Sequence, residues 1–269
     1  MRTLVHLSDL HFGRVDKAIL QPLIDRIKAI EPHVIVISGD LTQRARSAEF
    51  VEARKFLDEL PSPQIVVPGN HDVPLYNLFD RFFRALDKYQ KHITEDLSPF
   101  HVDEEIAVLG INTARSFTIK EGRINARQIA EIKARMCRLA PEVTKIVVTH
   151  HPFDLPENSP HGVVGRARQA MVAIANCGVD VILSGHLHLS HTGHSAERFD
   201  VGGHSSLIIQ AGTATSTRGR GEQNAFNVIR IDGKMIRIER NFWQPEGSLF
   251  GIAGTEQFEE TARGWVRAA

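Results

Sequence analysis

The chain has 269 residues, of which 42% are hydrophobic and 24% are charged, a composition typical of a globular protein with one large or two small domains. Basic and acidic side chains number 32 each, so no net charge draws the chain to nucleic acid or to an anionic membrane. No apolar run is long enough to cross a membrane, and the pattern around the first predicted strand leads us to expect no leader. We therefore expect a cytoplasmic protein without a membrane partner, for which nucleic acid is a disfavoured partner.

The two cysteines, Cys137 and Cys177, are too few for a disulfide framework. Both fall in predicted helices, where a small buried thiol is the usual role of a cysteine. We therefore expect two free thiols. Histidine is the unusual residue type in this composition, with 14 copies, and the positions of these histidines determine which chemistry the chain can support.

Short apolar runs alternate with amphipathic helices through most of the chain. The runs are rich in β-branched residues and end in turn residues, as buried strands do. They are Leu4–Leu7, Val34–Ile37, Ile65–Val67, Ile106–Ile111, Ile146–Val148 and Val181–Leu183. Alternating strands and helices predict an α/β fold with largely parallel pairing.

The segments between these strands carry the 3.6-residue period of helices. The apolar faces of the first two helices are Leu20, Leu23, Ile27 and Ile30, and Phe50, Ala53, Leu57 and Leu60. Asn125 and Gln128 have the spacing of a capping box and predict the start of a third helix. A further helix near Arg166 to Asn176 is expected to stop at Gly178.

The pattern changes after His188, where strands follow one another without long helices. These strands are Leu207–Gln210, Phe226–Ile231 and Met235–Phe242, and Asp232-Gly233 is a hairpin signal between the last two. We expect a second, partly antiparallel sheet that packs on the first. The fold class is α/β with two packed mixed β-sheets flanked by helices, in a single domain over residues 1–269.

Three segments interrupt this scheme. Residues 73–103 contain a stretch rich in Phe, Leu and Tyr, which we expect to form a helical cap beside the site. Residues 153–162 form a Pro-containing loop that could serve as a rim or lid. In the tail from Gln244 onward, Phe258, Ala262 and Trp265 have the spacing of one helical stripe, for which internal packing and homo-oligomerisation are equal alternatives.

Five of the apolar runs end in the same kind of polar residue. In chain order these endings are Asp9 and His11, Gly39-Asp40, Gly69-Asn70-His71-Asp72, His150-His151, and Gly185-His186-Leu187-His188. The carboxyl ends of parallel strands converge on the ligand crevice in open α/β sheets. We therefore expect these residues to meet in space.

The residue types at these endings are those of a metal site. Carboxylate, imidazole and amide oxygen without thiolate suit borderline divalent metals such as Mn, Fe, Zn, Co or Ni. In Asp-x-His and His-x-His, the two side chains of an extended strand end point to the same side and can hold one ion. The glycines before Asp40, Asn70 and His186 permit tight turns.

Taken together, these motifs resemble the signature of the calcineurin-like metallophosphoesterases, which runs D-x-H, G-D, G-N-H-[DE], H and G-H-x-H. The resemblance implies the sandwich fold of that family and two divalent metal ions per chain. One ion would be held by Asp9, His11, Asp40 and His188, and the other by Asp40, Asn70, His150 and His186, so that Asp40 bridges them. His150 is favoured over His151 because the ligand of the family stands two residues before a proline, here Pro152.

The resemblance also implies roles around the two ions. His71 would contact the phosphoryl oxygen or the leaving group, and Asp72 would orient His71. His151 would be an outer residue or would face the substrate, together with Asn70 and His71. In a dinuclear site the nucleophile is a metal-bridging hydroxide, so no Ser or Cys nucleophile is required.

The motifs discriminate between classes of phosphate ester. Ser/Thr protein phosphatases carry G-D-x-x-D-R-G and G-N-H-E, whereas this chain has Gly39-Asp40-Leu41-Thr42-Gln43-Arg44-Ala45 and ends the third motif in Asp72. The motifs are similar to the branch of class III cyclic nucleotide phosphodiesterases and glycerophosphodiesterases. A small phosphodiester is therefore the expected substrate, and Arg218 and Arg220 could meet a phosphate. The alternatives are a DNA nuclease and, less favoured, a phosphomonoesterase or a non-enzymatic scaffold.

Overall fold

The strands form two sheets, each of which mixes parallel and antiparallel neighbours. The computed structural model describes residues 1–118, 120–156, 159, 161–199, 201–217, 222–261 and 264–268. The seven-stranded sheet has the order β13 (Gly264–Arg267), β12 (Leu249–Thr261), β11 (Met235–Gln244), β10 (Ala225–Asp232), β1 (Arg2–Leu7), β2 (Val34–Ile37) and β3 (Gln64–Val66). The six-stranded sheet has the order β4 (Phe100–Val102), β5 (Ile106–Gly110), β6 (Thr144–Val148), β7 (Val181–Ser184), β9 (Leu207–Gln210) and β8 (His191–His194).

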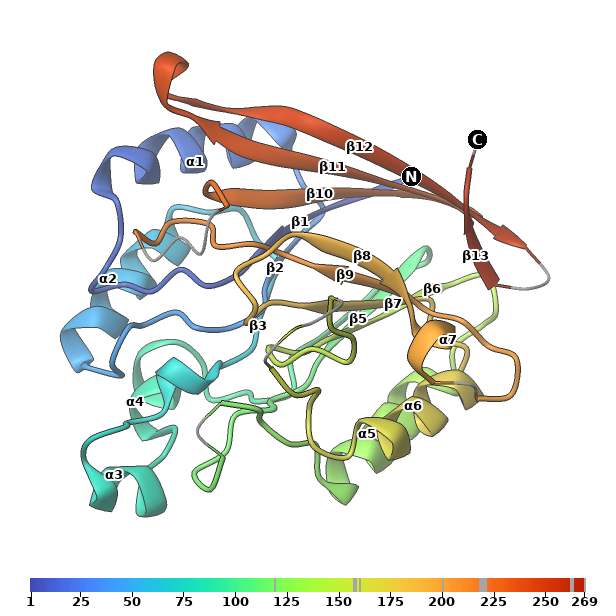
Figure 1. The fold of residues 1–269 in the computed structure, drawn as a ribbon, viewed down its shortest axis with the longest axis horizontal. Coiled ribbons are helices and arrows are strands. Elements are labelled where there is room, and N and C mark those ends of the chain that lie inside the picture. Colours follow the sequence, from blue (N-terminus) through green and yellow to red (C-terminus); the bar gives the residue numbers. More distant parts are fainter. Residues whose placement is uncertain are drawn as a thin grey trace.

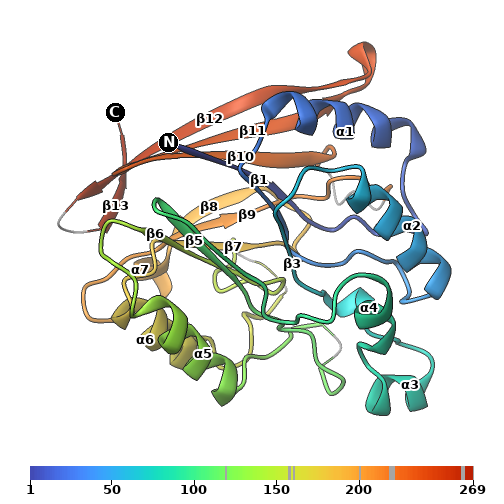
Figure 2. The same ribbon diagram turned by 180° about the vertical axis from the view of Figure 1, so that it is seen from behind.

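Helices cover the outer face of each sheet (Figures 1 and 2). The outer helices of the seven-stranded sheet are α1 (Lys17–Ile30) and α2 (Ser47–Asp58), and those of the six-stranded sheet are α5 (Ala126–Met136) and α6 (Ala167–Asn176). Shorter helical segments are η1 (Asn70–Asp72), α3 (Leu78–Phe83), α4 (Asp87–His92), α7 (Ser195–Arg198) and η2 (Pro245–Gly247). The two-sheet α/β architecture predicted from the sequence is confirmed.

Alternation along the strands divides the apolar side chains among three layers. In β2, Ile35 and Ile37 pack with the residues of α1 and α2, whereas Val34 and Val36 belong to the cluster between the sheets. In β5, Val108 lies in that central cluster, and Leu109 packs with α5 and α6. Successive side chains of a strand point to opposite faces of its sheet. These strands are apolar on both faces because helices cover one face and the other sheet covers the second.

Most of the predicted elements occur where they were expected. Asn125 caps α5, its side chain accepts from the backbone N–H of Gln128 at 2.9 Å, and the Gln128 side chain completes the capping box. Gly178 follows α6 with φ of +64°, a left-handed conformation that ends a helix without the steric cost of a Cβ atom.

The partition of the strands between the sheets differs from the prediction. β10 and the strands after it do not form a separate sheet, because β10 pairs antiparallel with the free edge of β1. β9, in contrast, joins the other sheet beside β7. The hairpin between β10 and β11 turns one residue later than expected, since Asp232 pairs with Met235 and Gly233 has φ of +55°.

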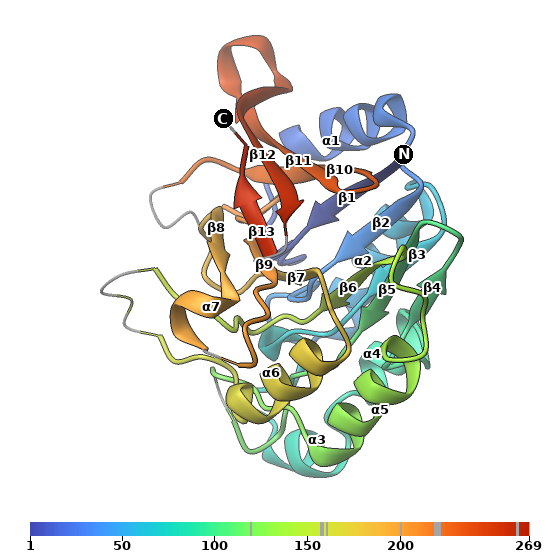
Figure 3. The same cartoon turned by 90° about the vertical axis from the view of Figure 1, so that its right-hand side faces the viewer.

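The prediction of two free thiols is wrong. Cys137 and Cys177 form a disulfide, and each is the first residue beyond the end of its helix, α5 and α6 respectively. The two helices lie side by side (Figure 3), and both run back from the carboxyl end of one strand to the start of the next. Their last turns therefore meet, which the separation of 40 residues in the sequence conceals.

The prediction of a helical stripe in the tail is also wrong. Phe258 lies in β12 and Trp265 in β13, and Ala262 lies outside the described residues. Phe258 and Trp265 are both buried in the cluster between the sheets. Two neighbouring strands bring these side chains to one apolar layer, and a spacing of seven residues does not distinguish that arrangement from two turns of a helix.

The segment expected to form a cap contains two short helices, α3 and α4. Tyr89 of α4 is buried, and its hydroxyl donates to the carbonyl of Val66. The apolar residues in and before α3 are instead exposed, and Phe83 has 76% of its surface accessible. Within the described residues, none of the helices combines the length and apolar character needed to cross a membrane.

Candidate metal centre

The polar residues predicted to meet do come together, at the carboxyl ends of strands from both sheets. Asp9, Asp40 and Asn70 follow β1, β2 and β3, which are neighbours in the seven-stranded sheet. His150 and His186 follow β6 and β7, which are neighbours in the six-stranded sheet. The centre therefore lies where the ends of two sheets face each other, rather than in a crevice of one sheet.

One group of candidate ligands lies close together near the end of β1 and consists of Asp9, His11 and His188. The Nε2 atoms of His11 and His188 are 3.3 Å apart. Asp9 Oδ1 lies 3.6 Å from Nε2 of His11 and 3.2 Å from Nε2 of His188. Asp40 Oδ2 approaches His11 Nε2 from another side, at 3.8 Å.

A second group lies on the other side of Asp40. The Nε2 atom of His150 is 3.4 Å from Asp40 Oδ2, 3.2 Å from Asn70 Oδ1 and 3.3 Å from His186 Nδ1. Asp40 Oδ2 thus faces both groups. Asp9, His11, Asp40 and His150 are at most 1% exposed, while Asn70 is half-buried and lies toward the solvent side.

These distances match those between the ligands of a metal ion. Atoms that lie about 2.0–2.2 Å from a central ion in tetrahedral geometry are about 3.3–3.6 Å from one another. Buried polar atoms normally have a hydrogen-bond partner, yet Asp9 Oδ1 in the first group is buried with none among the described residues. Three sets of buried His and Asp side chains in this region could each hold an ion. The donor atoms therefore fit divalent cations.

Hydrogen bonds from surrounding residues fix the orientation of the candidate ligands. Nδ1 of His150 donates to the carbonyl of Ser38 at 2.7 Å, which directs Nε2 toward Asp40. Nδ1 of His188 is 2.9 Å from the Thr213 hydroxyl. Asp9 Oδ2 accepts from the Ser8 hydroxyl and from the backbone N–H of His186. Such partners hold a ligand in the geometry that an ion requires.

The backbone at the candidate ligands is strained. Asp9, His11, Asp40, His186 and His188 all have φ between +51° and +73°, in the left-handed region. Non-glycine residues rarely adopt this conformation, which costs of order 1–3 kcal/mol each. Backbone strain of this kind concentrates at functional sites, since folding stability alone does not favour it.

The glycines of the motifs are required for space as well as for turns. A Cβ atom on Gly69 would lie 2.1 Å from Asp40 Oδ1, and one on Gly185 would lie 1.8 Å from Ser8 Oγ. A Cβ atom on Gly39 would meet the His150 ring at 2.7 Å. Each glycine lets the neighbouring backbone pass directly beside a candidate ligand.

The charges of the site leave both carboxylates ionised. Burial alone would raise the pKa of Asp9 and Asp40, but the facing histidines hold both pKa values well below the usual range. Burial would lower the pKa of His150, but the charge of Asp40 outweighs it and raises that pKa to about 9. The carboxylates are therefore stabilised by positive charge, as they would be by a cation.

His71 lies beside Asp40, as expected, but the contacts of Asp72 differ from those expected. Nδ1 of His71 donates to the carbonyl of Gln43 at 2.8 Å, and its backbone N–H donates to Asp40 Oδ1. The Asp72 carboxylate accepts from the backbone N–H groups of Gly69, Leu41 and Thr42 and from the Thr42 hydroxyl. Asp72 thus joins the loops after β2 and β3, and the Gln43 carbonyl helps to orient the His71 ring.

His151 does not line the opening of the site. Its side chain is completely buried, packs against His150 and His186, and has Nδ1 2.7 Å from the Thr113 hydroxyl. Of the two predicted alternatives, an outer residue or a substrate contact, the burial of His151 beside these rings favours the outer position. His6 is buried in β1, and burial lowers its pKa to about 3.

A cavity of about 150 Å³ opens directly onto the candidate ligands. It is lined by Asp40, Asn70, His71, Lys120, His161, His186 and His188. Sequence reasoning missed Lys120 and His161, although His161 lies in the loop predicted to be a rim and its ring packs against His186. Neither residue belongs to a motif, so only the folded loops reveal them. The predicted Arg218 and Arg220 lie outside the described residues.

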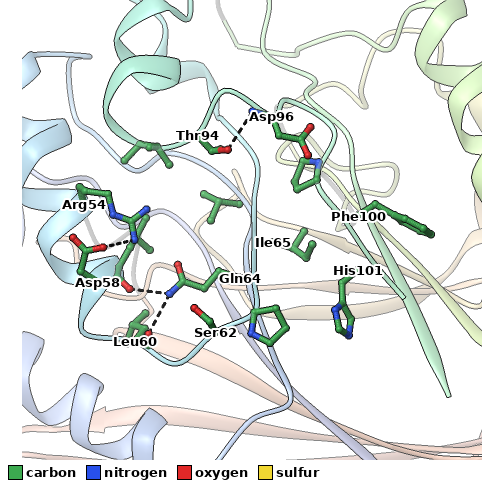
Figure 4. Close-up of a pocket in the computed structure, with 15 residues that line it drawn as sticks. Arg54, Asp58, Leu60, Ser62, Gln64, Ile65, Thr94, Asp96, Phe100 and His101 are labelled. Carbon is green, nitrogen blue, oxygen red and sulfur yellow. Dashed lines mark hydrogen bonds and ion pairs between the residues drawn. The ribbon is translucent and has the colours of Figure 1, made fainter. Parts of the chain in front are cut away.

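The cavity at the candidate ligands is smaller than another on the surface. A cavity of about 520 Å³ lies at the start of β3, between Arg54, Gln64 and His101 (Figure 4). The Gln64 amide there donates to the backbone carbonyls of Leu57 in α2 and of Leu60 beyond it, and Arg54 pairs with Asp58. None of the residues lining this cavity is a candidate ligand, because it lies at the opposite end of β3 from Asn70.

Comparison with protein families decides the class of this site. Residues 2–190 match the family model described as calcineurin-like phosphoesterase, and this range contains every candidate ligand. The chain belongs to this family. It is therefore a metallophosphoesterase, a metal-dependent hydrolase of phosphate esters.

Individual relatives support this assignment. The metallophosphoesterase is 32% identical over 163 residues to glycerophosphodiester phosphodiesterase GpdQ of Enterobacter lignolyticus, a match that covers 56% of this chain and 58% of GpdQ. Purple acid phosphatase PPD1 of yellow lupin superposes with a TM-score of 0.75 at 12% identity, over 97% of this chain and 54% of that one. A dimetal phosphatase of Danio rerio gives 0.66 at 11% identity, over 89% and 95%. At these identities the two solved structures establish the fold alone.

Proposed function

We propose that this metallophosphoesterase is a dinuclear phosphodiesterase that hydrolyses small phosphodiesters of the cyclic nucleotide or glycerophosphodiester type. The observation that carries the proposal is the position of Asp40. Its Oδ2 atom faces His11 Nε2 at 3.8 Å and His150 Nε2 at 3.4 Å. A carboxylate with a donor group on each side is the arrangement expected of a bridge between two ions.

The proposed ligands divide accordingly. Asp9, His11, Asp40 and His188 would hold one ion, and Asp40, Asn70, His150 and His186 the other. Two bound divalent ions supply activation of water and neutralisation of charge on the phosphoryl group. Asn70 is a neutral ligand, so its ion is expected to be the more weakly held. The donor set suits Mn, Fe, Zn, Co or Ni.

His71 is proposed to act on the departing oxygen of the ester. Its Nδ1–H donates to the carbonyl of Gln43 at 2.8 Å, which fixes the orientation of the ring. His71 is half-buried and lines the cavity beside Asp40. A protonated ring in this position can donate to the developing charge and return a proton to the leaving alkoxide.

The preference for a diester is supported by the room beyond His71 and by the relatives. A second cavity of about 300 Å³ continues from Asn70 and His71, so an ester arm on the phosphorus would have a place to lie. The relative GpdQ is a glycerophosphodiester phosphodiesterase by name. The Asp-Arg-Gly of protein phosphatases is absent after Asp40, which disfavours a phosphoprotein substrate.

A panel of phosphate esters tests the proposed substrate class. The purified, Mn²⁺-loaded protein is incubated with 3′,5′- and 2′,3′-cyclic nucleotides, glycerophosphodiesters, duplex DNA and nucleoside monophosphates, and product formation is followed by chromatography. We expect turnover of at least one small diester, and turnover of duplex DNA and monoesters that is slower by about 10-fold or more. The Asp40→Ala variant measured in parallel removes the contribution of contaminating enzymes.

Three outcomes would replace the proposal. Diester cleavage confined to DNA would identify a nuclease, in which the second cavity accommodates a nucleic-acid strand. Cleavage of monoesters only would identify a phosphatase. The absence of cleavage in every arm, with metal bound, would favour a scaffold that kept the fold and the ligands.

A further inference from the structure

The cavity beyond His71 adjoins the cavity at the candidate ligands, because the two share lining residues. Its lining residues are Arg14, Gln43, Arg44, Asn70, His71, Val73, Leu75, Tyr76 and Lys120. Asn70, His71 and Lys120 line both cavities. A substrate whose phosphorus lies at the candidate ligands can therefore extend one ester arm into this second space, which we call the basic pocket.

The charge of the basic pocket is of one sign. Arg14, Arg44 and Lys120 line it, and no carboxylate is among its lining residues. Within the part of the chain that the structure describes, no ion pair joins any of these three side chains to an acidic group. Three exposed cations that line a concave space, without an ion pair among the described residues, raise the local potential and attract an anion.

Two further contacts organise the pocket. The Arg44 guanidinium lies over the Tyr76 ring at 4.9 Å from its centre and donates to the Tyr76 hydroxyl. Arg14 lies in the turn after the candidate ligand His11, and its backbone N–H donates to the carbonyl of His11 at 2.9 Å. The positions of Arg14 and Arg44 are thus tied to the loops that carry His11 and Asp40.

We propose that the basic pocket binds a second anionic group, carried by one ester arm of the phosphodiester substrate. The inference rests on the proposed function and narrows it to diesters in which one alcohol bears a carboxylate or a phosphate. Arginine and lysine make charge-assisted hydrogen bonds to both groups. A cationic arm such as choline would instead meet three like charges, so the same pocket discriminates against it.

Four glycerophosphodiesters that differ only in the second alcohol test the proposal. The alcohols are 3-hydroxypropanoate, 2-hydroxyethyl phosphate, propane-1,3-diol and choline, and phosphorus NMR reads cleavage of either ester bond. We expect kcat/KM for at least one anionic arm to exceed that for propane-1,3-diol by about 10-fold, and choline to be the poorest. The ratio of kcat/KM for the anionic arm to kcat/KM for propane-1,3-diol should fall at high salt, because salt screens exposed charges.

The outcomes separate the inference from the proposed function. A preference for only the carboxylate or only the phosphate arm supports the proposal and names the group. Equal kcat/KM for all four arms overturns the inference while leaving the phosphodiesterase intact. Cleavage of none of the four, together with no hydrolysis of bis-(p-nitrophenyl) phosphate, removes the proposed function itself.

Variants that replace one cation of the basic pocket by glutamine test which side chains cause the preference for an anionic arm. Arg14→Gln, Arg44→Gln and Lys120→Gln should each lower the ratio of anionic-arm to neutral-arm kcat/KM several-fold, and mainly through KM. Arg127→Gln is the matched control, since Arg127 is an exposed arginine on α5, away from the pocket. Metal content and thermal unfolding verify that each variant is folded. An equal loss for every arm would mean that the three cations act on the scissile phosphate, which overturns the proposal.

Discussion

His11 and His188 bring their Nε2 atoms within 3.3 Å of each other although 177 residues separate them in the chain. His11 follows β1 of the seven-stranded sheet, and His188 follows β7 of the six-stranded sheet. Asp9 Oδ1 lies within 3.6 Å of both nitrogen atoms. A cation at this point would join the ends of the two sheets, so metal binding and the relative position of the sheets are expected to depend on each other.

The first prediction concerns the number of ions and the role of Asp40. The protein is purified gently with Mn²⁺ or Fe²⁺ supplied, and its metal content is measured by elemental analysis. We expect this content to approach two equivalents of metal per chain. Asp40→Ala should lose activity and most of the metal, because it removes the ligand that both groups share. A wild-type ratio that stays below one equivalent under saturating metal would exclude the dinuclear assignment.

The second prediction separates metal binding from catalysis. His71→Ala should keep both ions and lower kcat by about 10²- to 10³-fold, the effect of losing one donor to the transition state. The ring is held by the Gln43 carbonyl and is not among the proposed ligands. Metal content and steady-state kinetics are measured on the same preparation. Release of metal from His71→Ala would show that this side chain is a ligand.

A third prediction tests the close approach of Gly69 to Asp40. Gly69→Ala places a Cβ atom 2.1 Å from Asp40 Oδ1, so the carboxylate or the loop must move, and metal affinity should fall by about 10-fold or more, as when the environment of a ligand is disturbed. Gly254→Ala in β12 is the matched control, since its added Cβ would have nothing within 4 Å. Calorimetric metal titration of both variants makes the comparison. Equal affinities would refute the steric role of Gly69.

A fourth prediction concerns the disulfide between α5 and α6. Reduction, or the double substitution Cys137→Ser and Cys177→Ser, should lower the free energy of unfolding by about 2–4 kcal/mol, because the bond closes a long loop. The cysteines follow the ends of these helices, away from the candidate ligands. Urea unfolding with and without reductant measures the change, at constant metal concentration. A free energy of unfolding that reductant leaves unchanged would contradict the predicted stabilisation by this bond.

The sequence was sufficient for the parts of the structure that local patterns determine. Apolar runs predicted the strands, and the polar residues at their ends predicted which side chains would meet, because ligand residues follow strands directly. The capping box at Asn125 and the stop at Gly178 were likewise local signals. The positive φ angles of Asp9 and Asp40 could not be predicted, since their side-chain types do not require that conformation.

Features that depend on the packing of distant segments escaped prediction. The pairing of β10 with β1 and the disulfide depend on which elements become neighbours. The burial of His151 depends on the rings of His150 and His186 that cover it. Lys120 and His161 enter the site from loops without a motif. In each case the residue type is ordinary, and only its surroundings give it a role.

The comparison of a diester with a monoester tests the central claim most directly. Bis-(p-nitrophenyl) phosphate and p-nitrophenyl phosphate share a leaving group and differ in the second ester arm, for which the cavity beyond His71 provides room. At one pH and one Mn²⁺ concentration, we predict a higher kcat/KM for the diester, with both activities lost in Asp40→Ala. A clear preference for the monoester would contradict the assignment as a phosphodiesterase.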